Sequence, residues 1–211
     1  MRLLDLFCCQ GGAARGYADA GFDVTGVDIF PQPKYPYEFF NGDALAYLAV
    51  FGSTFDFIHA SPPCQKYTKA TKLRGNTHPD LIAPVRELLI KTGKPWVMEN
   101  VVGAPLINPI ELCGTMFGLK TYRHRLFESN FPIIAPPHRH HDSSSVKMGR
   151  PVKRGEYIHI VGHFSNVPYG REVMEMPWAN QYGLAQAIPP AYTRHIGGQF
   201  LTAATPPQQE R

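Results

Sequence analysis

The first hundred residues of this chain alternate short apolar runs with segments of helical periodicity, and this alternation constrains the fold more than any other feature. The runs predict strands over 2–7, 22–28, 55–60 and 95–99, and the periodic segments predict helices over 13–20, 44–51 and 81–91. Strands that alternate with helices usually pair in parallel, because each helix carries the chain back across the sheet. The sequence therefore predicts an α/β domain with a parallel sheet covered by helices.

Beyond about residue 130 the alternation is lost. Prolines crowd 131–137, three serines at 143–145 predict a loop, 156–161 predicts a strand, and 191–201 predicts a helix. We therefore expect a core over 1–129, a small insert over 130–177, a return to the core over 178–204 and a tail over 205–211. A chain of 211 residues is long enough for one core with such an insert.

Composition narrows the class of protein. A hydrophobic content of 44% excludes global disorder. We see no long apolar run and no charged-then-apolar leader, so we expect neither a membrane span nor a signal peptide. The four cysteines lack disulfide-framework or C-x-x-C spacing, which favours a reducing cytoplasm. The net charge of +4 gives a mild preference for an anionic partner, and no pattern indicates an oligomeric state.

One predicted strand end carries a cysteine. The sequence Ser61-Pro62-Pro63-Cys64-Gln65 directly follows the third apolar run. Ligands of open α/β sheets bind beyond the carboxyl ends of the strands, and the two prolines stiffen the turn that holds the cysteine. This position suits a nucleophile, although a free cysteine taken alone is more often a small core residue.

The turn after the first predicted strand holds Gly11 and Gly12, and the second predicted strand ends at Asp28. Glycines let the backbone approach a nucleoside-like cofactor, and an acidic residue at this point can accept hydrogen bonds from ribose hydroxyls. The spacing departs from G-x-G-x-x-G, so a purely structural turn explains it about as well.

A carboxylate and two arginines complete the candidate site. Glu99 ends the fourth predicted strand, on the same edge of the sheet as Cys64. Arg123 and Arg125 lie two residues apart in a segment predicted to be extended, which places them on one face. A cysteine and a carboxylate suit nucleophile and acid roles, and two arginines suit the binding of a planar polar group or a phosphate.

Together these residues resemble the DNA (cytosine-5)-methyltransferase family. Asp5-Leu6-Phe7 with Gly11-Gly12 is similar to its S-adenosyl-L-methionine motif, Pro62-Pro63-Cys64-Gln65 to its nucleophile motif, Glu99-Asn100-Val101 to its glutamate motif, Arg123 and Arg125 to its arginine pair, and 192–197 with Gln199 to its closing motif. Their order and spacing agree over most of the chain. The resemblance implies a Rossmann-like S-adenosylmethionine-dependent methyltransferase fold, with the small insert in place of a full target recognition domain.

The resemblance also implies an activity. A methyl group would pass from S-adenosyl-L-methionine to carbon 5 of a cytosine flipped out of double-stranded DNA, as in restriction–modification. Cys64 would attack the base, Glu99 would contact it, and Arg123 and Arg125 would complete the catalytic set. Phe7 would pack on the adenine, Asp28 would bind the ribose and Asp43 the adenine amine. Gly11, Gly12 and Pro63 would complete the cofactor site.

DNA contacts are implied at two basic segments. The first follows the nucleophile and contains Gln65, Lys66, Lys69, Lys72 and Arg74. The second lies in the insert and contains Lys147, Arg150, Lys153 and Arg154. Such groups contact phosphates and carry little base information. Solvated polar loops remain the alternative interpretation of both segments.

Three positions depart from the family pattern. Cys9 stands where the family usually has glycine, Thr121 where it has glutamine and Gly198 where it commonly has asparagine. Cys9 is the best support for an alternative function, a DNA-binding relative that has lost turnover. A further alternative is an enzyme of the same scaffold that modifies cytosine in RNA or uses a modified donor.

A histidine cluster in the insert offers candidate metal ligands. His138, His140 and His141 lie within four residues of one another, but no cysteine pair accompanies them. We therefore expect no metal. Cys8 and Cys113 are expected to be buried core residues.

Overall fold

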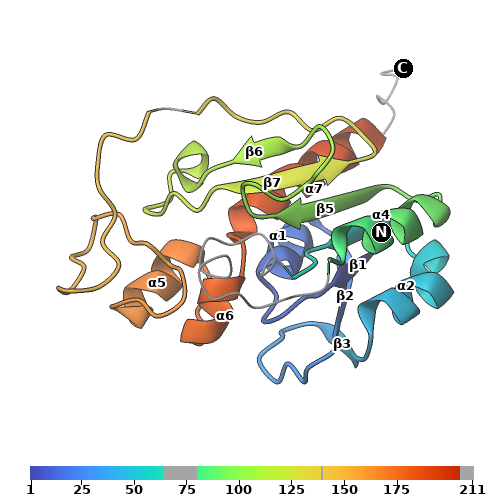
Figure 1. The fold of residues 1–211 in the computed structure, drawn as a ribbon, viewed down its shortest axis with the longest axis horizontal. Helices are drawn as coiled ribbons and strands as arrows, with labels where there is room; N and C mark the ends of the chain where they lie inside the picture. Colours follow the sequence, from blue (N-terminus) through green and yellow to red (C-terminus); the bar gives the residue numbers. More distant parts are fainter. Residues whose placement is uncertain (64–79, 139, 205–211) are drawn as a thin grey trace, which may run out of the picture.

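A computed structural model describes residues 1–63, 80–138 and 140–204. Its centre is a seven-stranded sheet with the order β3-β2-β1-β4-β5-β7-β6 (Figure 1). The strands are β1 (Arg2–Leu6), β2 (Asp23–Asp28), β3 (Glu38–Asn41), β4 (Phe57–Ala60), β5 (Trp96–Asn100), β6 (Ile110–Leu112) and β7 (Arg125–Ser129). The predicted α/β class is confirmed, and so are the four strands predicted from the apolar runs.

The sheet is parallel only from β3 to β5. β7 runs antiparallel to β5, with Glu99 opposite Phe127, and β6 runs antiparallel to β7. The parallel pairing expected for the four predicted strands is therefore confirmed, and the antiparallel edge is formed by β6 and β7, which lie outside that expectation. A parallel neighbour needs a long crossover, usually helical, whereas an antiparallel one can follow a short connection such as that from β6 to β7. This reversal brings the start of β7 beside the carboxyl end of β5.

The helices next to the sheet are α1 (Gly12–Ala20), α2 (Ala44–Phe51), α4 (Ile82–Lys91) and α7 (Pro190–Ala204). All four were predicted, and their ends follow local rules. Gly21 ends α1 with a φ of 106°, which glycine adopts without strain. Asp43 caps α2 by accepting a hydrogen bond of 2.8 Å from the amide of Ala46.

The late helix α7 returns to the amino-terminal half of the chain. It packs on α1, where the hydroxyl of Thr193 donates to the carbonyl of Ala13 at 2.8 Å. Gly16 permits this approach, because a Cβ there would lie 2.0 Å from the carbonyl oxygen of Pro190. The predicted helix after the proline pair is thus confirmed, and it packs on α1.

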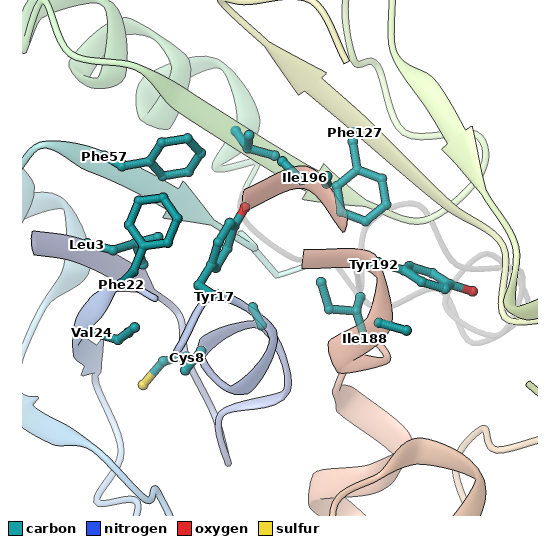
Figure 2. Packing of buried hydrophobic residues seen from close by; sticks show 14 of the residues in the cluster. Leu3, Cys8, Tyr17, Phe22, Val24, Phe57, Phe127, Ile188, Tyr192 and Ile196 are labelled. Carbon is teal, nitrogen blue, oxygen red and sulfur yellow. The ribbon is translucent and has the colours of Figure 1, made fainter. Parts of the chain in front are cut away.

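Two apolar cores cover the two faces of the sheet. Successive residues of a strand point to opposite faces, so Leu3 enters one core and Leu4 the other. Figure 2 shows the first core, where Tyr17 of α1, Phe57 of β4 and Tyr192 of α7 gather. Cys8 belongs to this core, and Cys113 is also buried, as expected.

A third, smaller core lies in the later part of the chain, around α5 (Val167–Met174) and α6 (Gln181–Gln186). Neither helix was predicted. The strand predicted over 156–161 is wrong, since Ile158 makes only an isolated bridge with Val146. The proposed domain boundaries stay a prediction. Across the described residues, helices of the length and apolarity needed to cross a bilayer are absent.

Candidate functional site

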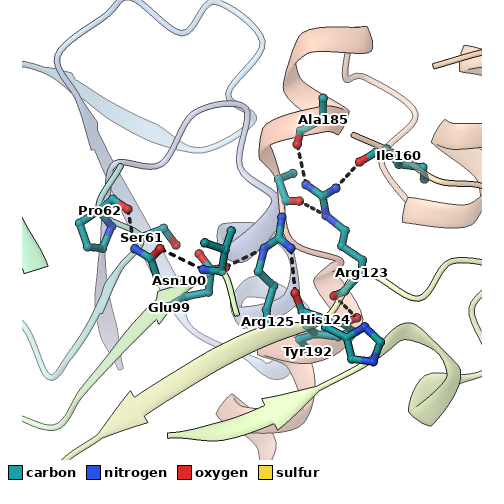
Figure 3. Close-up of polar contacts among 12 residues, drawn as sticks. Ser61, Pro62, Glu99, Asn100, Arg123, His124, Arg125, Ile160, Ala185 and Tyr192 are labelled. Atoms are coloured by element: carbon teal, nitrogen blue, oxygen red, sulfur yellow. Dashed lines mark hydrogen bonds and ion pairs between the residues drawn. The ribbon is translucent and has the colours of Figure 1, made fainter. Parts of the chain in front are cut away.

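The candidate site lies where β4 and β5 end. β4 leads into Ser61, Pro62 and Pro63. The side-chain amide of Asn100, the last residue of β5, donates to the carbonyl of Pro62 at 2.9 Å, and its oxygen accepts from the amide of Val101 at 2.9 Å (Figure 3). Asn100 thus ties the segment that leads to residue 64 to the neighbouring strand. Cys64 itself lies outside the described residues, as do Gln65, Lys66, Lys69, Lys72 and Arg74.

Glu99 and Arg125 form a buried ion pair at this edge (Figure 3). The guanidinium Nε of Arg125 lies 3.0 Å from Oε1 of Glu99, and the two side chains are only 14% and 9% exposed. Burial raises the pKa of the Glu99 carboxyl, and the positive charge of Arg125 opposes that rise. The structure therefore brings together two of the predicted catalytic residues, from strands that run in opposite directions.

A series of hydrogen bonds links the Glu99 carboxylate to buried polar groups. The hydroxyl of Ser61 hydrogen-bonds Glu99, and it also lies 3.0 Å from Nε2 of His59. The other ring nitrogen of His59 lies 3.1 Å from the hydroxyl of Tyr17. Burial lowers the pKa of His59 to about 3, so its ring is neutral. These contacts fix the rotamer of Ser61 and, through it, the carboxylate.

Arg123 lies apart from this pair. Its φ of 36° breaks the extended segment predicted over 122–127, and the strand begins only at Arg125. The Arg123 side chain is buried and donates to the carbonyls of Ala187, Ala185 and Ile160 (Figure 3). Its own carbonyl accepts from the hydroxyl of Tyr192 at 3.0 Å. These contacts join the start of β7 to the third core, and the predicted catalytic role of Arg123 stays a prediction.

Backbone strain is concentrated in the loop after β1. Phe7 and Cys9 have φ values of 59° and 46°, in the left-handed region that favours glycine, and Gly11 follows at 80°. The carboxylate of Asp28 holds this loop, because it accepts from the amides of Cys9 and Phe30 at 3.0 Å each. Strained residues of this kind cluster at functional sites.

A cavity of about 30 Å³ joins this loop to Glu99. Its lining residues are Asp5, Phe7, Cys8, Cys9, Gly12, Ala13, Ser61, Glu99, Gln186, Ala187 and Ile188. Oδ1 of Asp5 is buried and has no hydrogen-bond partner among the described residues. Burial, together with the negative charge of Asp28, raises the pKa of this carboxyl to about 8, against hydrogen bonds from Tyr35 and from the backbone of Ala14.

The remaining predicted cofactor residues have structural explanations as well. A Cβ at Gly12 would lie 2.5 Å from the carbonyl oxygen of Ile188, so packing requires this glycine. A Cβ at Gly11 would meet Pro36 at 3.0 Å. Asp43 is exposed at the cap of α2, and Pro63 is the last described residue before Cys64. Their roles toward a cofactor stay predictions.

The basic residues of the insert differ in their partners. Arg150 forms a bidentate pair with Glu156 at 2.8 and 3.0 Å, and Arg154 pairs with Glu172 at 3.0 Å. Lys147 and Lys153 are exposed. Exposed ion pairs are weak and exchange readily, so the arginines remain available to an anionic partner.

Three residues near the site received no role from the sequence: Asn100, Ser61 and Asp5. Asn100 directly follows Glu99, and Asp5 lies two residues before Phe7, inside motifs that the sequence identified. Their proximity to these two residues in the sequence could therefore have indicated a role for them. A second cavity, of about 340 Å³, was not foreseen. It lies beside the arginines and is lined by Thr121–Arg125, His141, Ser145 and Ile158–Val161.

No protein-family model and no curated protein matches this sequence. Solved structures do. A protein described as a candidate DNA modification methyltransferase encoded within an E. coli prophage has 13% identity and a TM-score of 0.60, over 97% of this chain and 100% of its own. S. pombe Dnmt2 methyltransferase has 11% identity and a TM-score of 0.64, over 97% of this chain and 99% of its own. The Entamoeba histolytica methyltransferase EhMeth has 11% identity and a TM-score of 0.62, over 98% and 99%.

At such low identity the likeness shows the fold alone. The chain has the Rossmann-like fold of S-adenosylmethionine-dependent methyltransferases, as predicted. The candidate site lies at the carboxyl ends of β1, β4 and β5, where open α/β sheets bind their ligands.

Proposed function

We propose that this chain is a DNA methyltransferase that transfers a methyl group from S-adenosyl-L-methionine to carbon 5 of cytosine through a covalent Cys64 adduct. One observation carries the proposal: the buried Glu99–Arg125 pair lies at the end of β5, where the next residue, Asn100, binds the carbonyl of Pro62, two residues before Cys64. The fold and the order of the motifs support the same assignment.

The residues around the small cavity fit S-adenosyl-L-methionine. Asp5 offers a buried acceptor oxygen, which suits a cationic group such as the ammonium of the methionine end. Phe7 offers an aromatic ring, and Asp28 a carboxylate at the end of β2. When bound, the cofactor supplies the methyl group. The chain's own contribution is to bind and orient it, with Gly11, Gly12, Asp43 and Pro63 around it.

Cys64 would act as the nucleophile. Its sulfur would form a bond to carbon 6 of the cytosine ring, which would make carbon 5 nucleophilic toward the methyl group of the bound cofactor, with S-adenosylhomocysteine as the leaving group. Loss of the proton from carbon 5 then breaks the bond between sulfur and carbon 6, and Cys64 is regenerated. The thiolate is the reactive form of a cysteine, so a nearby positive charge such as Arg125 favours the first step.

Glu99 would bind the ring opposite the nucleophile. Burial raises the pKa of its carboxyl, which makes proton transfer to the ring nitrogen easier as that nitrogen gains electron density when the thiolate attacks. Arg125 holds the carboxyl group in place and offsets negative charge as it develops. Arg123 would hold the start of β7 in place through the carbonyls that its side chain binds, and it would thereby position Arg125.

The base must leave the duplex to reach this edge of the sheet, so the substrate would be double-stranded DNA with the cytosine flipped out. Lys147, Arg150, Lys153 and Arg154 would contact phosphates. The segment after the nucleophile, with Gln65, Lys66, Lys69, Lys72 and Arg74, would contact the DNA strand around the flipped base.

The test is methyl transfer by the purified protein, followed by bisulfite sequencing of the product. Duplex DNA, single-stranded DNA and RNA of one sequence are compared with labelled S-adenosyl-L-methionine. We expect label in duplex DNA, at cytosines that resist bisulfite, and none with Cys64→Ala. Label in RNA alone would make the chain an RNA enzyme, and cofactor binding without transfer to any substrate would favour a DNA-binding relative.

A further inference from the structure

A second group of chemically active side chains lies outside the proposed catalytic set. It consists of Cys113, His124, His138 and His141, and we call it the Cys-His cluster. One ligand atom from each residue lies within 4.8 Å of every other. The members come from distant points of the chain: Cys113 follows β6, His124 precedes β7, and the other two lie beyond residue 130.

The individual distances suit a tetrahedral metal site. Nε2 of His141 lies 3.4 Å from the sulfur of Cys113 and 3.0 Å from Nε2 of His138. Around a zinc ion with Zn–N near 2.0 Å and Zn–S near 2.3 Å, ligand atoms are separated by about 3.3–3.6 Å. Two of the contacts therefore already lie close to the edges of such a tetrahedron.

The surroundings favour a divalent cation. Oε1 of Glu111 lies 3.6 Å from Nε2 of His124, and carboxylates beside ligating histidines orient the ring and offset the charge of the metal. The hydroxyl of Thr115 lies 3.2 Å from the sulfur of Cys113, where it can stabilise a thiolate.

Hydrogen bonds alone account for the cluster less well. A neutral imidazole has one donor and one acceptor, and His141 directs the same Nε2 at both Cys113 and His138. Its ring also stacks on Tyr122 with centroids 3.8 Å apart, which holds that nitrogen in place. A single cation bound by all four groups accepts one lone pair from each of the four ligand atoms.

We propose that Cys113, His124, His138 and His141 bind one zinc ion. The ligand types, one thiolate and three imidazoles, are those that select zinc over magnesium or calcium. Four protein ligands leave no open position, so the site is structural. It cross-links the end of β6, the start of β7 and the segment near residue 140, and it fixes His124 between Arg123 and Arg125. Binding displaces the thiol proton of Cys113 to solvent.

The sequence argued against a metal because no cysteine pair accompanies the histidines. The structure supplies the missing ligands from elsewhere, since sheet pairing brings Cys113 and His124 together. The proposal does not depend on the proposed methyltransferase function, and its test does not use activity.

The test compares two exposed histidines that lie two residues apart, His138 in the cluster and His140 outside it. Full-length wild type, His138→Ala and His140→Ala are incubated with zinc chloride, desalted and analysed for metal. We expect one zinc per chain in wild type and in His140→Ala. In His138→Ala we expect the affinity for zinc to fall by about 100-fold or more, because the loss of residues that only contact a ligand already lowers metal affinity by up to about 100-fold. Zinc should also raise the melting temperature of the first two proteins.

Cobalt(II) tests the ligand set without relying on stability. Wild type should show the visible absorption of tetrahedral cobalt and a near-ultraviolet thiolate-to-metal band, and Cys113→Ala should lose the thiolate band. Absence of stoichiometric zinc in wild type, or equal zinc binding by His138→Ala and His140→Ala, would overturn the site. Cobalt bound without a thiolate band in wild type would overturn the assignment of Cys113.

Discussion

Glu99 and Arg125 lie 3.0 Å apart in a nearly solvent-free edge of the sheet, although they belong to strands of opposite direction. A buried pair of this kind is costly to break, because removal of one partner leaves an uncompensated charge, at about 3–5 kcal/mol. The pair is thus both a structural element and the centre of the proposed chemistry, and variants must separate the two roles.

Glu99→Gln makes this separation. The amide keeps the size of the side chain and an acceptor for Arg125, but it cannot carry the proton that the proposed mechanism uses. We expect turnover to fall by about 100-fold or more, the cost of one electrostatic stabiliser in other active sites, with nearly unchanged affinity for S-adenosyl-L-methionine. Single-turnover kinetics and calorimetry measure the two quantities. Glu87→Gln, at an exposed position on α4, is the control, and full activity of Glu99→Gln would remove Glu99 from the mechanism.

Cys9→Gly should improve cofactor binding. Cys9 adopts a φ of 46° and lines the small cavity, so glycine relieves backbone strain and enlarges the site. Backbone strain of about 1 kcal/mol that is released when the cofactor binds corresponds to roughly fivefold tighter binding. Calorimetry with S-adenosyl-L-methionine measures it. Weaker binding by Cys9→Gly would mean that the thiol contributes a contact rather than crowding the site.

Asp5 should make the protein less stable as pH rises from about 6.5 to 8. The folded state keeps a proton on this carboxyl up to about pH 8, whereas the unfolded chain loses it near pH 3.9. Unfolding therefore releases a proton, and the free energy of unfolding falls by up to about 1.4 kcal/mol per pH unit. Below about pH 6.5 the buried His59 opposes this trend, because the unfolded chain takes up a proton there.

Urea unfolding of Asp5→Asn at several pH values checks this effect. The neutral amide resembles the protonated carboxyl, so the slope between pH 6.5 and 8 should flatten relative to wild type. Asp23→Asn, at the exposed start of β2, should keep the slope of the wild type. The same slope in wild type and Asp5→Asn would show that another group titrates.

DNA affinity should depend on Lys147 and Lys153 without setting the sequence that is recognised. Replacing both by glutamine should weaken binding to all duplexes about equally and reduce the salt slope by about two, one for each phosphate contact. Fluorescence anisotropy at several salt concentrations measures this. Methylation mapping of random DNA should give a short motif, of about two to four base pairs, in both proteins. A changed motif in the double variant would show that the insert reads bases.

Local signals were sufficient for much of the fold. Asp43 and Gly21 mark helix ends through caps that depend only on neighbouring residues, and both ends were predicted correctly. The strand ends that carry Glu99 and Pro63 followed from apolar runs. Long-range pairing was not accessible in this way. The antiparallel edge of β6 and β7 depends on how a connection closes in space, and short apolar runs do not specify direction.

The same limit applies to the sites. Glu99 and Arg125 were predicted individually, but their ion pair depends on the reversed direction of β7. Arg123 was expected beside Arg125, yet its positive φ turns the chain before the strand begins. The Cys-His cluster assembles from three separate segments, so no local spacing could indicate it.

The most direct measurement of the central claim is covalent trapping on Cys64. Duplex DNA with 5-fluorocytosine in place of cytosine is incubated with the protein and S-adenosyl-L-methionine. Fluorine at carbon 5 cannot leave as a proton does, so the bond between the Cys64 sulfur and carbon 6 should persist. The account predicts a denaturation-resistant protein–DNA adduct that mass spectrometry of the digested protein maps to Cys64, absent from Cys64→Ala. An adduct that maps to another residue, or methylated DNA without any adduct, would contradict it.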